Sequence, residues 1–219
     1  MDENESRAAT LKLVGGRLSL DFTNTVSYRN TDRQQDYLES YADLVAWCQH
    51  AGFVTDSQGK RLLEESANRP EEASSVLKRA IALREVIYSI FSAISHGNRP
   101  EPADLATFNT ELSNALARSQ VIQTAEGFAW DFTCTEDFLD CLLWPLARDA
   151  ANLMTSSDVD RVGECAGDDC EWLFFDVSRN RSRQWCAMED CGNRAKARRH
   201  YKRKRSASPA PSRMSDQNG

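Results

Sequence analysis

Cys165-Ala-Gly-Asp-Asp-Cys170 and Cys186-Ala-Met-Glu-Asp-Cys191 are two cysteine pairs with the same spacing, separated by fifteen residues. Four thiolates can complete the tetrahedral shell of one Zn²⁺ ion, with Zn–S distances near ~2.3 Å. An ion held by both pairs closes a unit too small to build its own core, so metal binding supplies much of its folding energy. The pattern therefore predicts one structural Zn²⁺ ion held by Cys165, Cys170, Cys186 and Cys191.

Two other interpretations of these cysteines are open. The four residues could be buried or disulfide-bonded, or they could hold an iron–sulfur cluster. Seven cysteines are an odd number, which argues against a complete disulfide framework. The N-terminal stretch MDENESRAAT has no apolar signal segment, and no run approaches the ~18 apolar residues of a membrane helix. We therefore expect a cytoplasmic protein, in which disulfides are disfavoured.

The residues between and after the pairs predict the shape of this unit. Trp172–Asp176 is strand-like, 179–183 is turn-like, and a helix is expected to begin near Cys191. A knuckle, a hairpin and a helix in this order form a small treble-clef-like zinc finger with four cysteine ligands. The positive end of the helix dipole would face the thiolates, where it is favourable.

Positive charge is concentrated at the same end of the chain. Residues 161–219 carry 13 Lys and Arg against 8 Asp and Glu, whereas residues 1–160 carry 14 against 25. Lys and Arg pair with phosphates and release counterions, so a cationic helix on a metal-fixed base indicates nucleic acid, with duplex DNA as the expected partner. A solvated tail is the alternative. The candidate contact residues are Arg179, Arg181, Arg183, Asn193, Arg194, Lys196, Arg198, Arg199, Lys202 and Arg203.

The larger part of the chain reads as a helix-rich α+β domain with short β-hairpins, over residues 1–156. Apolar periodicity predicts helices, and glycine-centred turns predict hairpins. The finger is expected at 161–205 and a disordered tail at 206–219. The predicted helices are 36–51, 57–68, 71–95, 102–118 and 136–154, the last kinked by Pro145; the predicted hairpins surround Gly15-Gly16 and span 121–132; and 155–163 reads as a linker.

Arg84 lies on the apolar stripe of the predicted 71–95 helix, where a guanidinium needs a partner. Asp21 and Asn24 follow an apolar stretch and are candidate partners. One interpretation is a buried Arg–Asp pair that fixes this stretch on the helix. The other is a pocket in which Asp21, Asn24 and Arg84 bind a small polar effector.

The finger motifs resemble the CGNR zinc-finger family, named after the run from Cys191 to Arg194. The matching residues are Cys165-x4-Cys170, Phe174-Phe175-Asp176-x-Ser178-Arg-Asn-Arg-Ser-Arg183, Trp185-Cys186-x4-Cys191-Gly192-Asn193-Arg194 and Lys196. The stretch Gly15-Gly16-x-Leu18-x-Leu20-Asp21-Phe22-x-Asn24-Thr25 resembles the start of the ABATE domain, which accompanies this finger in bacteria. The resemblance implies a bacterial DNA-binding regulator whose four finger cysteines are the zinc ligands.

These observations together predict a zinc-dependent DNA-binding transcriptional regulator associated with the nucleoid. The N-terminal domain would sense a ligand or dimerise, since two-fold regulators match palindromic sites. An RNA-binding or ribosome-associated protein is one alternative, and an enzyme domain carrying a localising finger is another. The sequence has no Ser/His/Asp pattern, P-loop or GxGxxG motif, so we expect no catalytic activity.

Overall fold

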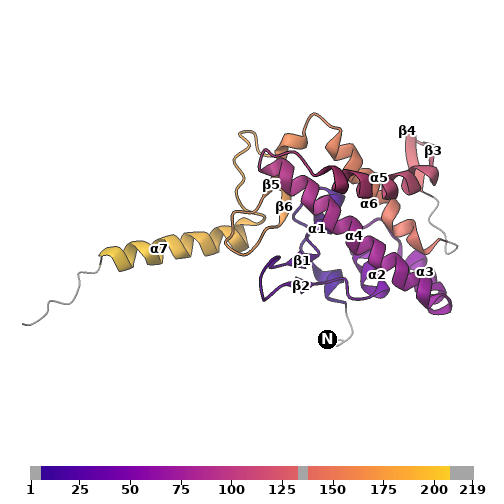
Figure 1. Ribbon diagram of the computed structural model, residues 1–219, viewed down its shortest axis with the longest axis horizontal. Helices are drawn as coiled ribbons and strands as arrows, with labels where there is room; N and C mark the ends of the chain where they lie inside the picture. The colour runs from indigo at the N-terminus through magenta and orange to yellow at the C-terminus, as the bar shows by residue number, and fades with distance from the viewer. Residues whose placement is uncertain (1–5, 133–137, 208–219) are drawn as a thin grey trace, which may run out of the picture.

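The computed structural model of the protein describes residues 6–132 and 138–207 (Figure 1). A body of packed helices makes up most of the molecule, and one long helix, α7, runs out from it into solvent. The predicted tail lies outside the described residues from residue 208 onward, and residues 206 and 207 are the last of α7. The helices are α1 (Leu18–Thr23), α2 (Tyr41–His50), α3 (Asp56–Asn68), α4 (Pro70–Ser95), α5 (Pro102–Ala117), α6 (Leu143–Met154) and α7 (Asn193–Ala207).

The fold class is confirmed, because the described chain is mostly helical and its strands form three antiparallel pairs. The predicted helices 57–68, 71–95 and 102–118 match α3, α4 and α5 to within one residue. The helix predicted over 36–51 begins later, at Tyr41, because Ser40 caps it and forms a capping box with Asp43. Residues Gln35–Asp36 form strand β2 instead, paired with β1 (Val26–Ser27).

The hairpin predicted around Gly15-Gly16 is wrong, because Leu18–Thr23 is helix α1. The apolar residues on either side of the glycine pair suggested two strands, but a short helix that is buried on most sides also gives a short apolar run. The Asp21 carboxylate accepts the N–H of Gly15 at 2.7 Å and folds the glycine pair back on the helix. A Cβ atom at Gly15 would lie 2.7 Å from the Asp21 nitrogen, so this turn requires glycine.

The second predicted hairpin is confirmed as β3 (Ser119–Thr124) and β4 (Gly127–Phe132). The first residues of the predicted helix 136–154 lie outside the described residues. Its described part is a 3₁₀ turn, Leu139–Leu142, followed directly by α6. Pro145 occupies the first turn of α6, where a missing N–H removes no intrahelical bond, so it does not kink the middle of the helix.

The segment predicted as a linker is ordered and contributes to the core. It contains a 3₁₀ turn, Val159–Arg161, and the start of β5 (Val162–Glu164), which pairs with β6 (Leu173–Phe175). Val162, Leu173 and Phe175 are buried in the same hydrophobic core as the helices. The β5–β6 hairpin of the finger therefore lies directly on the helical body, as the positions of α1, α4 and both strands in Figure 1 show.

Arg84 has a different partner from the two that the sequence suggested. Its side chain is 2% exposed, and its two terminal nitrogens both donate to Asp36 at 2.7 Å. The β1–β2 pair brings Asp36 beside α4, a contact that no local pattern indicates. Asp21 binds Gly15 instead, and Asn24 binds the backbone of Leu173. A buried Arg–Asp pair is therefore present, but its acid lies in β2.

A second contact joins the helical body to the finger through buried polar groups. The Asn24 side chain, at the end of α1, donates to the Leu173 carbonyl and accepts the Leu173 N–H, both at 2.9 Å. Phe175 donates its N–H to the Gly15 carbonyl at 2.7 Å. These bonds connect strand β6 to the residues on either side of α1, namely Gly15 and Asn24.

We predict that Asn24→Ala lowers the free energy of unfolding by about 2–3 kcal/mol, because it leaves buried groups of Leu173 without these bonds. Asn109→Ala, on the exposed surface of α5, is the matched control and should change stability by less than about 0.5 kcal/mol. Urea unfolding of the zinc-loaded protein measures both. Equal stability of the two variants would contradict the role assigned to Asn24.

The Asp21 carboxyl makes the free energy of unfolding depend on pH. Burial raises the pKa of its carboxyl to about 6, against the opposing effect of the N–H groups of Gly15 and Gly16. The folded state therefore favours the protonated carboxyl, relative to an unfolded pKa of ~3.9. This group stabilises the fold fully below pH ~4, and the contribution is lost as the pH rises through about 6.

We predict that Asp21→Asn removes this dependence, since an amide still accepts the Gly15 N–H but does not titrate. The difference in unfolding free energy between variant and wild type should change by about 1–2 kcal/mol between pH 4 and pH 7. Asp32→Asn, an exposed carboxylate, should leave the profile unchanged. Thermal unfolding across this range is the measurement, and parallel curves for wild type and Asp21→Asn would refute the assignment.

Candidate metal centre and nucleic-acid interface

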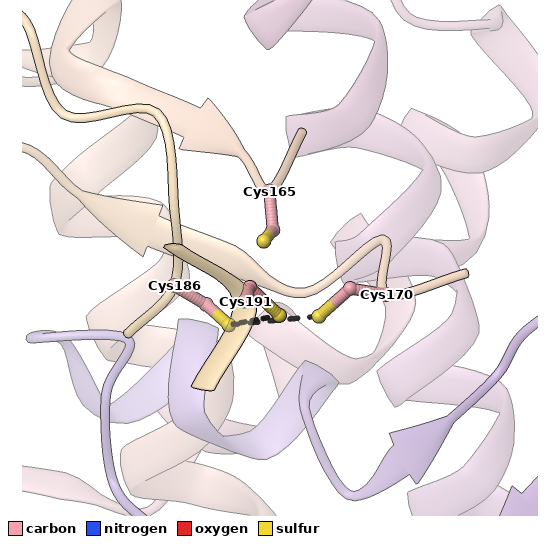
Figure 2. Close-up of side chains that lie close together, drawn as sticks. All are labelled: Cys165, Cys170, Cys186 and Cys191. Carbon is pink, nitrogen blue, oxygen red and sulfur yellow. Dashed lines mark hydrogen bonds between the residues drawn. The ribbon is translucent and has the colours of Figure 1, made fainter. Parts of the chain in front are cut away.

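The sulfur atoms of Cys165, Cys170, Cys186 and Cys191 all lie within 4.8 Å of one another (Figure 2). The Sγ atom of Cys186 is 3.5 Å from that of Cys170 and 3.6 Å from that of Cys191. Tetrahedral Zn²⁺–thiolate bonds place sulfur atoms about 3.8 Å apart, so these separations fit one ion. The four cysteines are positioned to bind one metal ion, in agreement with one structural zinc.

Backbone hydrogen bonds hold the first cysteine pair in a tight knuckle between β5 and β6. Cys165 follows β5 and donates its N–H to the Trp172 carbonyl at 2.9 Å, while the Cys170 N–H donates to Gly167 at 3.0 Å. A Cβ atom at Gly167 would come within 3.2 Å of the Cys191 sulfur. A larger residue at Gly167 would therefore crowd the sulfur atoms at the metal position.

The run from Cys191 to Arg194 joins the metal position to α7, and each residue has its own part. Gly192 is buried, and a Cβ atom there would lie 2.3 Å from the Met188 sulfur. The Asn193 amide donates to the Glu189 carbonyl at 3.1 Å and so ties the first turn of α7 to the π-helical turn Met188–Gly192. The run thus provides a metal ligand (Cys191), a glycine that packs closely against Met188, the hydrogen bond of Asn193 with Glu189, and a cation (Arg194).

That cation, Arg194, donates to the Cys191 sulfur at 3.0 Å. The hydrogen bond raises the pKa of Arg194 above its ordinary value. A guanidinium beside a coordinating sulfur favours its thiolate form, which is the form that binds metal. Arg194, in the first turn of α7, therefore stabilises the Cys191 thiolate at the metal centre.

The loop after β6 is held by a buried carboxylate. Asp176 accepts the N–H of Ser178 at 2.7 Å and that of Arg183 at 2.9 Å. The Arg183 guanidinium lies 4.3 Å from the centre of the Phe174 ring and donates to four backbone carbonyls, among them Val14 and Cys186. Arg183 therefore holds the backbone around the finger with four of its five N–H donors, and its contact with nucleic acid stays a prediction.

The cations of α7 divide between two faces of the helix. Arg194 and Arg198, four residues apart, share the face turned towards the finger, where Arg198 pairs with Asp168. Lys196, Arg199 and Arg203 lie on the opposite face and are exposed. Lys202 is also exposed on this helix, as are Arg179 and Arg181 in the loop, where Arg181 pairs with Asp160.

The structure does not gather the three candidate effector residues into one site. Within residues 6–132 and 138–207, no hydrogen bond joins Asp21 or Asn24 to Arg84, and each side chain has protein partners.

Two ion pairs that sequence reasoning missed, Lys12–Asp190 and Arg33–Asp169, connect the finger to the N-terminal segment. The paired residues are more than a hundred positions apart, so no local signal marks them.

The fold and this site define a helix-rich protein that carries a four-cysteine zinc finger. The family model for ABATE, described as "Putative stress-induced transcription regulator", matches residues 16–157, and the model of the CGNR zinc finger matches residues 161–204. The chain therefore belongs to the ABATE family and carries a CGNR zinc finger over residues 161–204. A comparison with curated proteins finds no match. None of the helices described combines the length and apolar character needed to cross a bilayer.

We predict that Arg194→Met weakens zinc binding about tenfold, because outer-shell partners of metal ligands typically contribute a factor of ~10–100 to affinity. Competition with a coloured zinc chelator at fixed pH measures the change. Arg199→Met, on the opposite face of the same helix, removes the same charge and should retain wild-type affinity. Equal losses in the two variants would show a general charge effect and contradict the role of the Arg194–Cys191 contact.

Proposed function

We propose that this protein is a zinc-dependent DNA-binding transcription regulator that contacts duplex DNA through its finger. The observation that carries the proposal is the exposed cationic face of α7, formed by Lys196, Arg199 and Arg203 on a helix that begins at the metal centre. Arg179, Arg181 and Lys202 are further exposed cations that can contact phosphate. The family match to a transcription regulator supports the same role.

The geometry of α7 suits a nucleic-acid groove. The helix has 15 residues, which corresponds to a length of about 22 Å. Short isolated helices are marginal in water because the first turn is costly to form. Here the cysteine-bearing turn fixes that first turn, so the rest of the helix can project as a cationic rod. The major groove of B-DNA, ~12 Å wide, admits such a helix.

The remaining parts of the proposal concern the helical domain and the setting. We propose that residues 1–156 sense a ligand or dimerise, and that the protein acts without catalysis in the bacterial cytoplasm, associated with the nucleoid. A dimer would present two α7 helices to the two halves of a palindromic site. Structured RNA is the other polyanion that a cationic helix could bind, so its affinity is compared with that of duplex DNA.

The test is fluorescence anisotropy of a labelled duplex across a salt series. Lys196, Arg199 and Arg203 are replaced together by Gln. Each lost phosphate contact should lower the slope of log affinity against log salt by ~0.9, so the triple variant should lose about 2–3 from the slope. Removal of zinc with a chelator should also abolish binding, because the first turn of α7 depends on the metal.

Lys60, Lys78 and Arg99, replaced together by Gln, are the charge-matched control, since all three are exposed on the helical domain. This variant should bind with the wild-type slope. Equal slope losses in the two triple variants would refute α7 as the contact surface. Tighter binding of a structured RNA than of a duplex of equal length would replace DNA by RNA as the partner.

A further inference from the structure

A cavity of about 510 Å³ lies where the finger meets the β1–β2 segment of the helical domain. It is lined by residues from both parts, including Tyr28 and Tyr37 from the domain and Trp172 from the finger. The first turns of α7 form part of the wall through Arg194 and Ala197. Cavities of ~300–1,000 Å³ with apolar walls and a few convergent polar groups are typical of small-molecule sites.

Three aromatic side chains give this cavity its apolar walls. The Trp172 indole is held in place because its N–H donates to the Val26 carbonyl at 2.8 Å. Arg33 lies 5.0 Å from the centre of the Tyr28 ring, and Arg7 lies 5.3 Å from that of Tyr37. Each of these tyrosine rings thus has one guanidinium of the protein near it, as the negative face of an aromatic ring favours.

The side chains that line the cavity carry more acids than cations, while Arg33 and Arg7 lie beside its tyrosine rings. Its lining includes three acids, Asp169, Glu189 and Asp190, and two cations, Lys12 and Arg194. Cys170, Cys186 and Cys191 also line the cavity. When zinc is bound, four thiolates and one dication carry a net charge of about −2. The walls are therefore apolar and aromatic, and the rim carries the ion pairs Lys12–Asp190 and Arg33–Asp169. The remaining negative charge lies at Glu189 and, with zinc bound, at the thiolates.

We propose that this cavity binds a small organic cation, an amine or quaternary ammonium compound with an apolar body. The body would pack against Tyr28, Tyr37 and Trp172. The cationic group would lie near Glu189 and the thiolates, where the negative charge of these groups disfavours anions. Glu189 is the lining acid for which the described residues show no ion pair, so its charge is available to the ligand.

The position of the cavity links the ligand to the finger helix. Asn193, Arg194 and Ala197 contact the cavity, and the same helix carries the exposed cationic face. A ligand there would change the affinity of the finger for nucleic acid, and nucleic acid would change the affinity for the ligand by the same factor. This consequence rests on the proposed function, whereas binding of the cation itself does not.

The experiment uses the full, zinc-loaded chain without nucleic acid, so its outcome is independent of the DNA proposal. Isothermal titration calorimetry compares three probes of similar shape: 2-phenylethylammonium, neutral 2-phenylethanol and anionic phenylacetate. We expect saturable one-to-one binding of the cation. The alcohol should bind at least about fivefold more weakly, and phenylacetate more weakly still, because each loses the charge interaction.

Two pairs of variants locate the site. Tyr28→Leu should weaken binding of the cation about fivefold or more, whereas Tyr28→Phe, which keeps the ring, should bind as wild type. Glu189→Gln should weaken binding about fivefold, whereas Glu126→Gln, at the distant β3–β4 turn, should not. Zinc content and thermal unfolding of each variant confirm that the finger is intact.

Each outcome decides the proposal. Preference for the cation, lost in Tyr28→Leu and Glu189→Gln only, supports it. Absence of saturable binding, equal binding of the neutral alcohol, or equal affinity in all four variants overturns it. If Tyr28→Leu fails to fold, the comparison of Glu189→Gln with Glu126→Gln still decides, because Glu189 is exposed and makes no ion pair in the described part of the chain.

Discussion

Coordination of one metal ion by four thiolates is the constraint on which the rest of this finger depends. Cys165 and Cys170 join the ends of β5 and β6, while Cys186 and Cys191 bring the chain back to the same point before α7 begins. Apart from these sulfurs, the finger has only a small cluster of buried residues around Phe174. Metal binding therefore supplies the folding energy that a larger apolar core would otherwise provide. It also fixes the direction in which α7 leaves the body.

The finger is not an independent unit beside the helical domain. Its β5–β6 hairpin buries Val162, Leu173 and Phe175 in the main core, and the hydrogen bonds of Asn24 with Leu173 close the joint. Peripheral ion pairs at Lys12 and Arg33 add little stability because they are exposed to solvent. These buried contacts make the β5–β6 hairpin of the finger part of the same core as α1 and α4.

Sequence reasoning succeeded where the signal is local. The three long helices α3, α4 and α5 follow from apolar periodicity, and the β3–β4 hairpin follows from its central turn. It failed where tertiary burial overrides local pattern: Leu18–Thr23 was predicted as part of a hairpin, because a six-residue helix that is buried on most sides is too short to show a helical period. Strand β5 was missed because three residues with one buried position carry almost no pattern.

By itself, the sequence determined the four metal ligands, the helix-rich class and the placement of positive charge at one end of the chain. These properties depend on residue type and spacing along the chain, which tertiary packing does not change. The tertiary structure alone decided which acid pairs with Arg84, that Arg183 holds backbone carbonyls, and that Tyr28, Tyr37 and Trp172 line one cavity. Such contacts join residues far apart in sequence, and only the packing of β1–β2 and the finger around α1 and α4 brings them together.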